Sequence, residues 1–569
     1  MTLAGSAQLF IFLGLLLATI RPLGGYLYRV FAGEGTWLSP LLRPIEVVLY
    51  RAAGVRPDEE QHWHRYALAF MVFHLPGMLL LYVILRFQNV LPFNPAGQPA
   101  VSPDLALNTA VSFATNTSWQ SYGGETTLSY LAQMAGIAVQ SFLSAAAGLA
   151  VAMALIRGLA RRGAGTIGNF WADTTRAVLY VLLPICVVAT LVLAWQGVPQ
   201  TLAGPVAAAT LDGAKQLISL GPVASQEAIK LLSGDGGGFF NAQSAHPFEN
   251  PTALTNLLGI LLMPLLGAAL TNTFGRMVGR EREGWALLAA MLVLLLAGAV
   301  ALHVVEGAGN PVLAAAGIDQ HLGNLEGKDL RFGVPGSTLF SELATATSSG
   351  AVNAMQDSYM PLSGLVLLGN MMLDEVIIGG PGSGLFGMLL FALVAVFVGG
   401  LMIGRTPEYV GNKIEAREIK MTMLAILAVP TALLVLTAIA VVIPTGLAGL
   451  GNAGPHGFTE VLYAYTSAAN TNGSSFAGLS TNTPFYNLTL ALAMAVGRFL
   501  VAVPVIALAG SLATKRRIAD SLGTLPTTGT VWIGLLLGVI VIVGGLTYLP
   551  ALALGPVAEH FAMLRGTVY

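Results

Sequence analysis

Ten long apolar segments alternate with shorter polar connections along the chain. They cover residues 4–20, 66–87, 129–156, 176–197, 253–275, 285–305, 364–403, 420–445, 484–513 and 529–553. A helix needs roughly 20 apolar residues to cross a bilayer, so each segment is long enough to cross once. The segment 364–403 is too long for one straight helix, and the Gly- and Pro-rich run at 379–384 predicts a break in its middle. This pattern predicts an all-α integral membrane protein with about ten transmembrane helices.

Four polar stretches rich in Gly, Ser, Thr and Asn recur between these segments, at residues 114–119, 233–241, 346–351 and 469–474. If Ser118, Gly237, Gly350 and Gly473 are taken as equivalent, successive stretches lie 119, 113 and 123 residues apart. Such regular spacing predicts one unit repeated four times. The predicted repeats are 66–162, 163–283, 284–418 and 419–517. They follow a first span with its connection (1–65) and precede a last span with the C-terminus (518–569).

Each repeat is predicted to run as a span, a short amphipathic helix, a polar stretch and a second span. Short helices are expected at 225–232, 337–345 and 457–467, the first two with Ser225 and Ser337 as N-caps. Backbone that enters a membrane and turns back is tolerated only where it is buried in protein or lines a wet cavity. Four such segments around one pore can form a channel-like ion filter, because glycine lets carbonyl oxygens point to a common centre.

The candidate filter residues are those that offer hydroxyl, amide or backbone oxygens in the four stretches. They are Thr115, Asn116, Thr117, Ser118, Gly234, Asp235, Gly236, Gly237, Thr347, Ser348, Ser349, Gly350, Asn470, Thr471, Asn472 and Gly473. Gln120, Asn241 and Asn353 are predicted to support them. Runs of Gly, Ser and Asn are usually plain turns, which is the alternative for any one stretch. Four stretches at matching spacing favour the filter.

Basic residues gather in every second connection between the apolar segments. They are Arg21, Arg29, Arg43, Arg51 and Arg56, then Arg157, Arg161 and Arg162, then Arg276, Arg280 and Arg282, then Arg405, Lys413, Arg417 and Lys420, and finally Lys515, Arg516 and Arg517. Because Lys and Arg favour cytoplasmic loops, the four polar stretches and both termini are predicted to lie outside. Residues 22–65 form the longest cytoplasmic connection, with an interfacial amphipathic helix expected at 38–51.

Composition narrows the class of protein further. The 569 residues are 55% apolar and only 10% charged, with a net charge of −1, whereas soluble proteins carry about 25% charged residues. The near-zero charge argues against a nucleic-acid partner. Cys186 is the only cysteine, which excludes a disulfide framework, and the scattered histidines have no partners at zinc spacing. We therefore expect no covalent cofactor and no catalytic metal, and a lipid environment.

At the four stretches the sequence resembles a known family. The matching residues are 115–125 (TNTSWQSYGGE), 236–251 (GGGFFNAQSAHPFENP), 349–355 (SGAVNAM) and 467–474 (SAANTNGS). They resemble the KdpA family, the potassium-binding subunits of Kdp potassium-transporting P-type ATPases, within a superfamily of potassium transporters. Gly234 and Asp235 stand where Thr-Asn is common in that family, and Ser349 where Cys can occur.

The resemblance implies a function that composition does not. It implies a chain in the bacterial cytoplasmic membrane that selects K⁺ outside and passes it through an intramembrane tunnel to a catalytic subunit resembling KdpB. Small subunits resembling KdpC and KdpF would complete the complex. K⁺ would be the transported ion, held at the candidate filter residues.

Three charged residues lie inside apolar segments: Asp374 and Glu375 in the seventh and Arg498 in the ninth. A charge at the bilayer centre costs at least about 2.5–3.5 kcal/mol, so it normally faces the protein interior with a partner. We hypothesise that Arg498 lies on the cytoplasmic side of the filter, pairs with Asp374 or Glu375, and prevents straight-through leakage. The alternative is a structural ion pair that locks two repeats. Gly380 and Gly382 are predicted to form a cytoplasmic gate; a helix break that serves only packing is the competing interpretation.

Three functions remain open from the sequence. The chain could be the ion-selecting subunit of an ATP-driven pump, a self-sufficient potassium channel or symporter of the same superfamily, or a membrane enzyme or scaffold. It contains no Asp-Lys-Thr-Gly-Thr phosphorylation motif and no Walker loop, so ATP would be used by a partner subunit and not by this chain. The extra first and last spans and the long motif matches favour the pump subunit.

Overall fold

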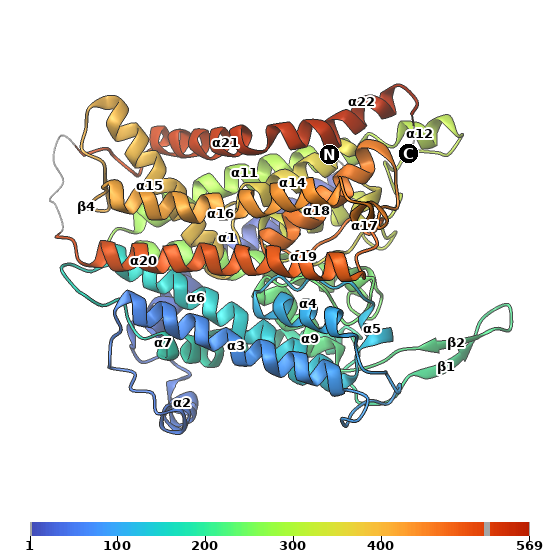
Figure 1. Cartoon of the computed structure of the whole chain (residues 1–569), viewed down its shortest axis with the longest axis horizontal. Coiled ribbons are helices and arrows are strands. Elements are labelled where there is room, and N and C mark those ends of the chain that lie inside the picture. Colours follow the sequence, from blue (N-terminus) through green and yellow to red (C-terminus); the bar gives the residue numbers. More distant parts are fainter. Residues whose placement is uncertain (1–2, 517–523, 568–569) are drawn as a thin grey trace.

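The computed structural model describes residues 3–516 and 524–567, which form a bundle of long, roughly aligned helices (Figure 1). Within these residues, ten helices are long and apolar enough to cross a membrane. The predicted all-α membrane fold is therefore confirmed. Arg517, predicted above to belong to a basic connection, lies outside the described residues.

The spanning helices follow the predicted order. They are α1 (Leu3–Ala32), α3 (Trp63–Phe87), η1 (Ala132–Ala138) with α6 (Val139–Ala160), α7 (Phe170–Arg176) with η2 (Ala177–Leu182) and α8 (Leu183–Trp195), α10 (Ala253–Met277), α11 (Glu281–Gly307) with α12 (Pro311–Ala315), α15 (Ser383–Ile403), α16 (Ala416–Ala440), α19 (Pro484–Ala495) with η5 (Val496–Leu500) and α20 (Val501–Ala513), and α21 (Thr530–Leu552) with η6 (Ala553–Val557) and α22 (Ala558–Leu564). The η segments in these spans are π-helical turns.

Shorter elements lie between the spans. The helices are α2 (Ser39–Ala53), α4 (Pro103–Ala114), α5 (Gly124–Thr127), α9 (Val223–Ser233), η3 (Gln243–Ala245), α13 (Gly333–Ala346), η4 (Gln356–Ser358), α14 (Pro361–Met372), α17 (Pro444–Leu447) and α18 (Gly454–Ala469). Two antiparallel pairs join β1 (Val206–Ala209) with β2 (Lys215–Ile218) and β3 (Glu408–Tyr409) with β4 (Asn412–Lys413). The β1–β2 hairpin projects beyond the helices (Figure 1).

The first span is longer than predicted, because α1 continues past Arg21 and Pro22 to Ala32. Leu27, Val30 and Phe31 are buried, and this part of α1 packs along α10. Tertiary packing therefore keeps residues 22–32 helical, and the cytoplasmic connection predicted at 22–65 begins only after them.

The interfacial helix predicted at 38–51 is α2, which buries Leu42, Glu46 and Tyr50 on one face. Glu46 accepts hydrogen bonds from the hydroxyls of Tyr50 (2.9 Å) and Tyr180 (2.8 Å) and from Arg176 Nε (3.1 Å). Burial opposes the charge of the Glu46 carboxylate, but these hydrogen bonds outweigh burial and lower its pKa. The charged side chain thus fastens α2 to the fourth span.

Four short helices, α4, α9, α13 and α18, precede the four polar stretches. The predicted N-caps are wrong. Helix α9 begins at Val223 and α13 at Gly333, so Ser225 and Ser337 lie within the helices. The Ser225 hydroxyl instead faces the Pro222 carbonyl and Gln200, because a neighbouring connection pairs with this helix start.

The seventh apolar segment is broken as predicted. Helix α14 ends at Met372 and α15 begins at Ser383, and the intervening residues are not helical. Four of them adopt positive φ angles: Asp374 (55°), Glu375 (51°), Gly379 (70°) and Gly382 (103°). The break therefore contains two left-handed acidic residues as well as glycines.

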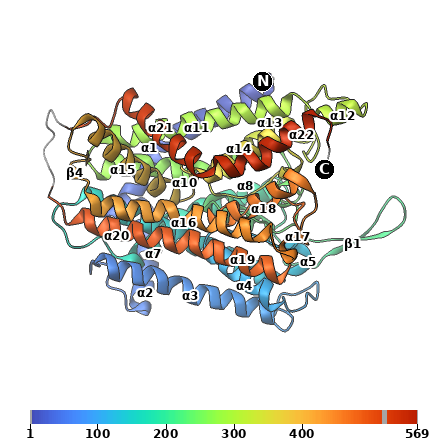
Figure 2. The same cartoon turned by 45° about the horizontal axis from the view of Figure 1, so that its top comes forward.

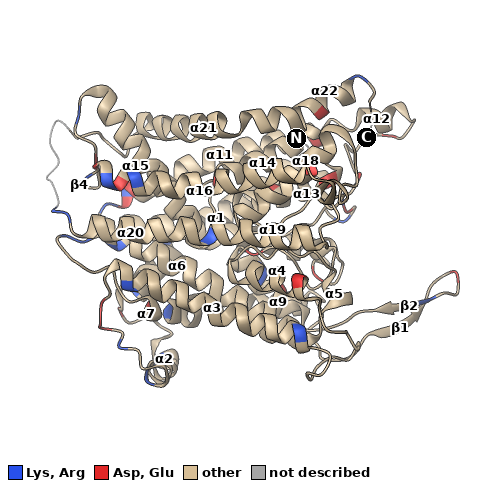
Figure 3. Ribbon diagram, in the orientation of Figure 1, with Lys and Arg blue, Asp and Glu red and all other residues tan. Residues whose placement is uncertain are grey.

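Most charged residues lie toward the two ends of the bundle, and only a few lie in its middle (Figure 3). The two marked chain ends lie toward the same end of the bundle, which is also the end from which the β1–β2 hairpin projects (Figures 1 and 2). Both features are those of a multi-pass membrane protein with an even number of crossings.

Candidate functional site

The four polar stretches share one unusual backbone conformation. Each follows a short helix, and the residues equated by spacing all have positive φ: Ser118 (59°), Gly237 (70°), Gly350 (58°) and Gly473 (101°). The left-handed region costs an ordinary L-residue roughly 1–2 kcal/mol, which Ser118 sustains and the three glycines avoid. Strained backbone of this kind clusters at functional sites because the surrounding structure holds it in place.

The stretches are arranged as a closed ring. In every case, a Cβ added to a glycine of one stretch would lie 3.1 Å or less from backbone atoms of the next. The successive contacts are Gly237 with Ser118, Gly236 with Gly350, Gly350 with Asn472, and Gly473 with Thr117. Each stretch therefore touches two others, in the order first, second, third, fourth and back to the first.

Side chains reinforce three of these contacts with hydrogen bonds. Asn116 Nδ2 donates to the Ser233 carbonyl (3.1 Å), linking the first and second stretches. The Ser349 hydroxyl donates to the Asp235 carbonyl (3.1 Å), linking the third to the second. Asn472 Nδ2 donates to the Ala344 carbonyl (2.9 Å) at the end of α13.

Several predicted ligand side chains bond back to their own repeat instead. Thr347 Oγ1 donates to Leu343 (2.6 Å) and Asn470 Nδ2 to Thr466 (2.9 Å), while Thr115 Oγ1 lies 2.8 Å from Thr117 Oγ1. Ser118 Oγ, in contrast, is buried and finds no hydrogen-bond partner within residues 3–516 and 524–567. The ring is thus built from backbone, and most of its hydroxyl and amide groups brace that backbone.

Gln120 bridges the first and second stretches from behind. Its Oε1 accepts from the Gly238 N–H (2.9 Å) and its Nε2 donates to the Gly238 carbonyl (3.2 Å) and toward the Tyr122 hydroxyl (3.3 Å). One amide therefore satisfies both backbone groups of a residue in the neighbouring repeat, which fixes the distance between the two stretches.

The other two predicted supporting residues differ from each other. Asn353 is buried and its Nδ2 donates to Asn256 Oδ1 (3.0 Å), which ties the third stretch to α10. Asn241 is exposed, and its backbone N–H donates to Glu125 (2.9 Å). The structure therefore does not bring the Asn241 side chain to the ring, because the chain has already turned outward after Phe240.

Glu375 joins the third and fourth stretches. It is 2% exposed, accepts a hydrogen bond from Asn472 Nδ2 on Oε1 (2.8 Å), and accepts another from the Ser348 hydroxyl on Oε2. Hydrogen bonds to a charged group are worth about 1.5–3 kcal/mol each, roughly twice those between neutral groups. The left-handed backbone conformation at Glu375 directs its side chain toward the third and fourth stretches.

Arg498 does not form the predicted ion pair. It lies in the π-helical turn η5, and its guanidinium donates to the Ser144 carbonyl on α6 (2.6 Å). Among the residues that the structure describes, it forms a salt bridge with neither Asp374 nor Glu375. The reason is that Glu375 is turned toward the two stretches above it, so the pairing hypothesis is wrong.

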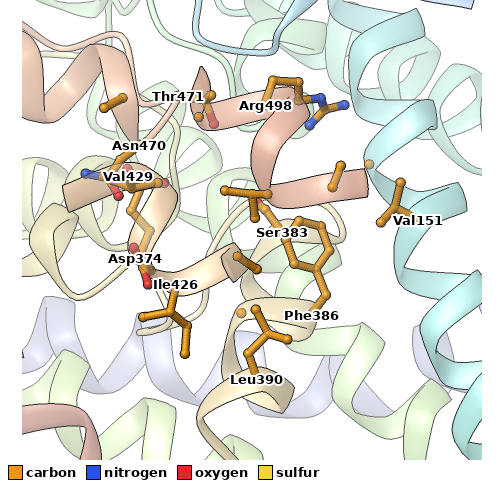
Figure 4. A pocket seen from close by; sticks show the side chains of 18 residues that line it. Val151, Asp374, Ser383, Phe386, Leu390, Ile426, Val429, Asn470, Thr471 and Arg498 are labelled. Carbon is orange, nitrogen blue, oxygen red and sulfur yellow. The ribbon is translucent and has the colours of Figure 1, made fainter. Parts of the chain in front are cut away.

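A small cavity lies beside the ring, between these charged residues (Figure 4). Its volume is about 60 Å³, and its lining includes Asn470 and Thr471 of the fourth stretch, Asp374, Ser383 and Arg498. A cavity needs a volume of at least about 10–15 Å³ to hold one water molecule, so this cavity can hold a few waters or a partly hydrated ion. The cavity brings the basic and acidic groups around one space whose lining is otherwise largely apolar.

The broken segment packs directly against the ring and the third span. A Cβ on Gly234 would lie 3.0 Å from Pro381 Cδ, and one on Gly148 of α6 would lie 2.6 Å from the Pro381 carbonyl. The Gly379 N–H donates to the Ala346 carbonyl at the end of α13 (2.9 Å). Gly380 and Gly382 therefore lie between the ring and α6.

The chain was compared with known proteins. The family described as KdpA, potassium-transporting ATPase A subunit, matches residues 10–561. The chain belongs to the KdpA family. It is 61% identical to the potassium-transporting ATPase potassium-binding subunit of Methylorubrum populi, over 100% of this chain and 99% of that protein. It is 60% identical to the protein of the same description from Granulibacter bethesdensis, over 100% of both chains.

A solved structure shares the fold of this KdpA family member. The potassium transporter TrkH from Vibrio parahaemolyticus has 16% sequence identity and a TM-score of 0.51, over 89% of this chain and 98% of that chain. Membership of the KdpA family favours the non-catalytic subunit of a potassium-transporting ATPase over a self-sufficient channel or symporter.

The second stretch departs from the conformation of the other three. Asn116, Ser348 and Thr471 have positive φ two residues before the equated position, whereas Asp235 does not and Gly234 is left-handed instead. The Asp235 side chain is fully buried, accepts from the Ser233 hydroxyl (2.9 Å), and leaves Oδ1 without a hydrogen-bond partner among the described residues. Gly234 and Asp235, the two residues singled out in this stretch from the sequence, are therefore also the ones with a different geometry.

The sequence prediction missed an ionic network behind this second stretch. Lys230 of α9 is buried, donates to Glu249 (2.7 Å) and Ser244 (3.0 Å), and forms an ion pair with Glu227. Glu249 also accepts from the Phe240 N–H (2.8 Å). The signal was available, because Glu227 and Lys230 are the only charged residues of this short helix and have the i,i+3 spacing of an ion pair.

Proposed function

We propose that this chain binds K⁺ in the ring formed by residues 115–118, 234–237, 347–350 and 470–473, and that it is the ion-selecting subunit of an ATP-driven potassium uptake complex. The observation that carries the proposal is the closed ring of four left-handed backbone segments, each held at the end of a short buried helix. Rings of backbone carbonyl oxygens can replace the water shell of K⁺. The relatives' description as potassium-binding subunits supports the same ion.

The ring belongs to four repeats of span, short helix, polar stretch and span, with the boundaries predicted from the sequence. The protein lies in the bacterial cytoplasmic membrane with the ring and both termini on the outer side. The support is the clustering of Lys and Arg in alternate connections.

Below the ring, the ion leaves sideways and does not continue straight through. The positive charge of Arg498 lies beside the cavity under the fourth stretch, and the broken segment with Gly380 and Gly382 packs against the second and third stretches. A fixed positive charge and a packed backbone both oppose passage of a cation along the pore axis. The ion then passes to a P-type ATPase subunit resembling KdpB, which uses the ATP, and subunits resembling KdpC and KdpF complete the assembly.

The experiment uses the complex purified with its partner subunits. K⁺, and not Na⁺, should stimulate ATP hydrolysis. The variant Gly237→Ala should raise the K⁺ concentration needed for half-maximal stimulation, because a Cβ at φ 70° would meet Gln120 Oε1 at 2.8 Å and the Ser118 carbonyl at 2.9 Å.

A matched control is Gly213→Ala at the tip of the β1–β2 hairpin. Gly213 also has positive φ (78°), but a Cβ there would meet nothing within 4 Å. Equal stimulation by Na⁺, or identical K⁺ dependence of the two variants, would count against the ring as the selective site.

A further inference from the structure

Three potential metal-ligating side chains meet in a cluster separate from the ring. Asp357 comes from η4, after the third polar stretch, and His456 and Glu460 come from α18, before the fourth. One ligand atom of each lies within 4.8 Å of the corresponding atoms of the other two. We call this group the Asp357–His456–Glu460 cluster.

A fourth carboxylate orients the imidazole of the cluster. Glu559 of α22 lies with Oε1 2.8 Å from His456 Nδ1, while His456 Nε2 faces Asp357 Oδ1 at 3.4 Å. Metal-binding histidines commonly donate one ring N–H to a carboxylate, which fixes the tautomer and leaves the other nitrogen for the metal. Here Glu559 occupies Nδ1, and Nε2 points into the cluster.

Two carboxylates of the cluster have no cationic partner other than His456 among the described residues. Glu460 is fully buried and accepts hydrogen bonds from Asn452 Nδ2 (2.7 Å) and the Gly451 N–H (3.3 Å), both neutral groups. The Asp357 side chain is only 10% exposed, and apart from the His456 Nε2 atom at 3.4 Å its Oδ1 has no polar partner in the described part of the chain. Both carboxylates also press against Gly478, where a Cβ would lie 2.8 Å from Asp357 Oδ2 and would collide with Glu460.

Buried like charges this close are unfavourable unless a cation lies between them. A single imidazolium is the only cation that the described residues provide at the cluster, against the three carboxylates of Asp357, Glu460 and Glu559. A divalent ion bound at Nε2 would take the place of the proton on that nitrogen, which is released to solvent, and would offset more of the negative charge than the proton does.

We propose that Asp357, His456 and Glu460 bind one divalent transition-metal ion of the Zn²⁺ type, with Glu559 positioning the imidazole. Imidazole nitrogen with carboxylate oxygen is a ligand set that suits zinc, whereas Ca²⁺ and Mg²⁺ take oxygen ligands alone. Zinc bonds of about 2.0–2.2 Å imply ligand separations of roughly 3.4 Å, so the side chains close in by about 1 Å on binding. A water completes the coordination.

An open route leads to the site. Asp357, His456 and Glu559 line a cleft of about 350 Å³ together with Glu326 and Asn452. Its acidic lining favours the approach of a cation.

The site is also linked to the ring. Gln356, next to Asp357, accepts a hydrogen bond from the Tyr463 hydroxyl (2.6 Å), which lies 2.8 Å from the hydroxyl of Ser474, the last residue of the fourth stretch. The ion would therefore clamp the third and fourth repeats together at the outer end of their contact, with the C-terminal helix α22 behind it.

The test is direct metal binding to the purified complex after treatment with a chelator. Titration with Zn²⁺, followed by calorimetry, should show one saturable site per chain with micromolar or tighter affinity, and Zn²⁺ should raise the thermal unfolding midpoint. Co²⁺ should bind the same site and give visible absorption typical of low-coordinate nitrogen and oxygen ligation. Glu460→Gln and Asp357→Asn should abolish this binding, and Glu559→Gln should weaken it by about 10–100-fold, as is usual for a partner of a metal-bound histidine.

The matched control is His321→Gln. His321 is exposed and lies 2.5 Å from Asp319, a histidine–carboxylate pair outside the three-residue cluster. This variant should bind Zn²⁺ like the wild type. The proposal is overturned if no saturable Zn²⁺ binding occurs, if Asp357→Asn leaves it unchanged, or if Ca²⁺ binds as tightly as Zn²⁺. Should Glu460→Gln fail to assemble, Asp357→Asn and Glu559→Gln decide the outcome.

Discussion

The two sides of the ring are held together by different chemistry. Where the first and second stretches meet, neutral amides make the links: Gln120 brackets Gly238, and Asn116 reaches Ser233. Where the third and fourth meet, one buried carboxylate, Glu375, accepts from both. On the first side, the charged groups lie behind the second stretch; on the other, a charge lies in the contact itself.

This difference shows how one chain can build a ring of four unequal parts. In a ring made from four identical subunits, the same contacts must occur at all four junctions. In this single chain, the contacts between neighbouring stretches can differ from one junction to the next. The contact between the first and second stretches is stabilised by several well-placed hydrogen bonds between neutral groups. The contact between the third and fourth is stabilised by fewer but stronger hydrogen bonds to a carboxylate. We therefore expect substitutions on the two sides to differ in size and in kind.

The largest expected effect comes from the charges behind the second stretch. Lys230→Met leaves Glu227 and Glu249 buried without their cation, and breaking a buried ion pair in this way costs about 3–5 kcal/mol. The thermal unfolding midpoint of the purified complex should fall sharply. A loss of 1 kcal/mol lowers the unfolding midpoint by about 2–4 degrees in a domain of 150–250 residues. A midpoint within 1–2 degrees of the wild type would therefore mean that the ionic network does not stabilise the second stretch.

Next is the carboxylate between the third and fourth stretches. Glu375→Gln keeps the shape but removes the charge and turns an amide donor toward the donors of Ser348 or Asn472. A loss of about 1.5–3 kcal/mol corresponds to a rise of roughly 10–100-fold in the half-saturating K⁺ concentration. K⁺-stimulated ATP hydrolysis measures it.

Asp374→Asn is the matched control for that change. Asp374 is the neighbouring left-handed acidic residue, and its Oδ1 has no hydrogen-bond partner in the described part of the chain. It should change the half-saturating concentration by about twofold or less, since no charged hydrogen bond at Oδ1 is lost. Equal effects of the two variants would remove the special role given to Glu375.

A smaller effect is expected at the neutral contact. Gln120→Ala removes its two hydrogen bonds to Gly238 and the one toward Tyr122, all between uncharged groups and each worth about 0.5–1.5 kcal/mol. Because Gln120 is only partly buried, water can replace its amide, so we expect a total loss near the lower end, about 1 kcal/mol, and a rise of about 5–10-fold in the half-saturating K⁺ concentration, less than for Glu375→Gln. A larger effect at Gln120 than at Glu375 would reverse the comparison between the two sides.

The smallest effect on affinity is expected below the ring. In the described part of the chain, Arg498 donates a hydrogen bond to Ser144 on α6 and to no residue of the four stretches, so Arg498→Gln should leave the half-saturating K⁺ concentration nearly unchanged. It should instead lower the K⁺ transported per ATP hydrolysed, or allow passive K⁺ flux, both measurable in proteoliposomes. An unassembled complex would point to a purely structural role, and unchanged transport would contradict the proposed barrier.

Much of the fold followed from the sequence, because its signals are local. The lengths of the apolar segments gave the ten spans, and the run 379–384 gave the break between α14 and α15. The end of the first span was placed twelve residues too early, at residue 20 and not at Ala32, since packing on α10 overrides the local signal of Arg21 and Pro22. The N-caps at Ser225 and Ser337 failed because α9 and α13 begin two and four residues earlier, at Val223 and Gly333.

The positions of the four unusual backbone segments could be predicted from the sequence, but the contacts of their side chains could not. Spacing alone equated Ser118, Gly237, Gly350 and Gly473, and all four are left-handed. The partner of Arg498 and the exposure of Asn241 depend on which way a side chain turns after an irregular segment, and no periodic pattern encodes that. Glu375 was identified as a buried charge, but its contact with Ser348 and Asn472 joins residues 27 and 97 positions away.

The central claim is that the ring binds K⁺, and the most direct measurement locates the ion itself. Tl⁺ can replace K⁺ and is located in a crystal by its anomalous scattering. We predict a Tl⁺ peak inside the ring, between Ser118, Gly236, Gly350 and Asn472, that is displaced by excess K⁺ and not by excess Na⁺. Tl⁺ bound only elsewhere, or displaced equally by Na⁺, would contradict the account.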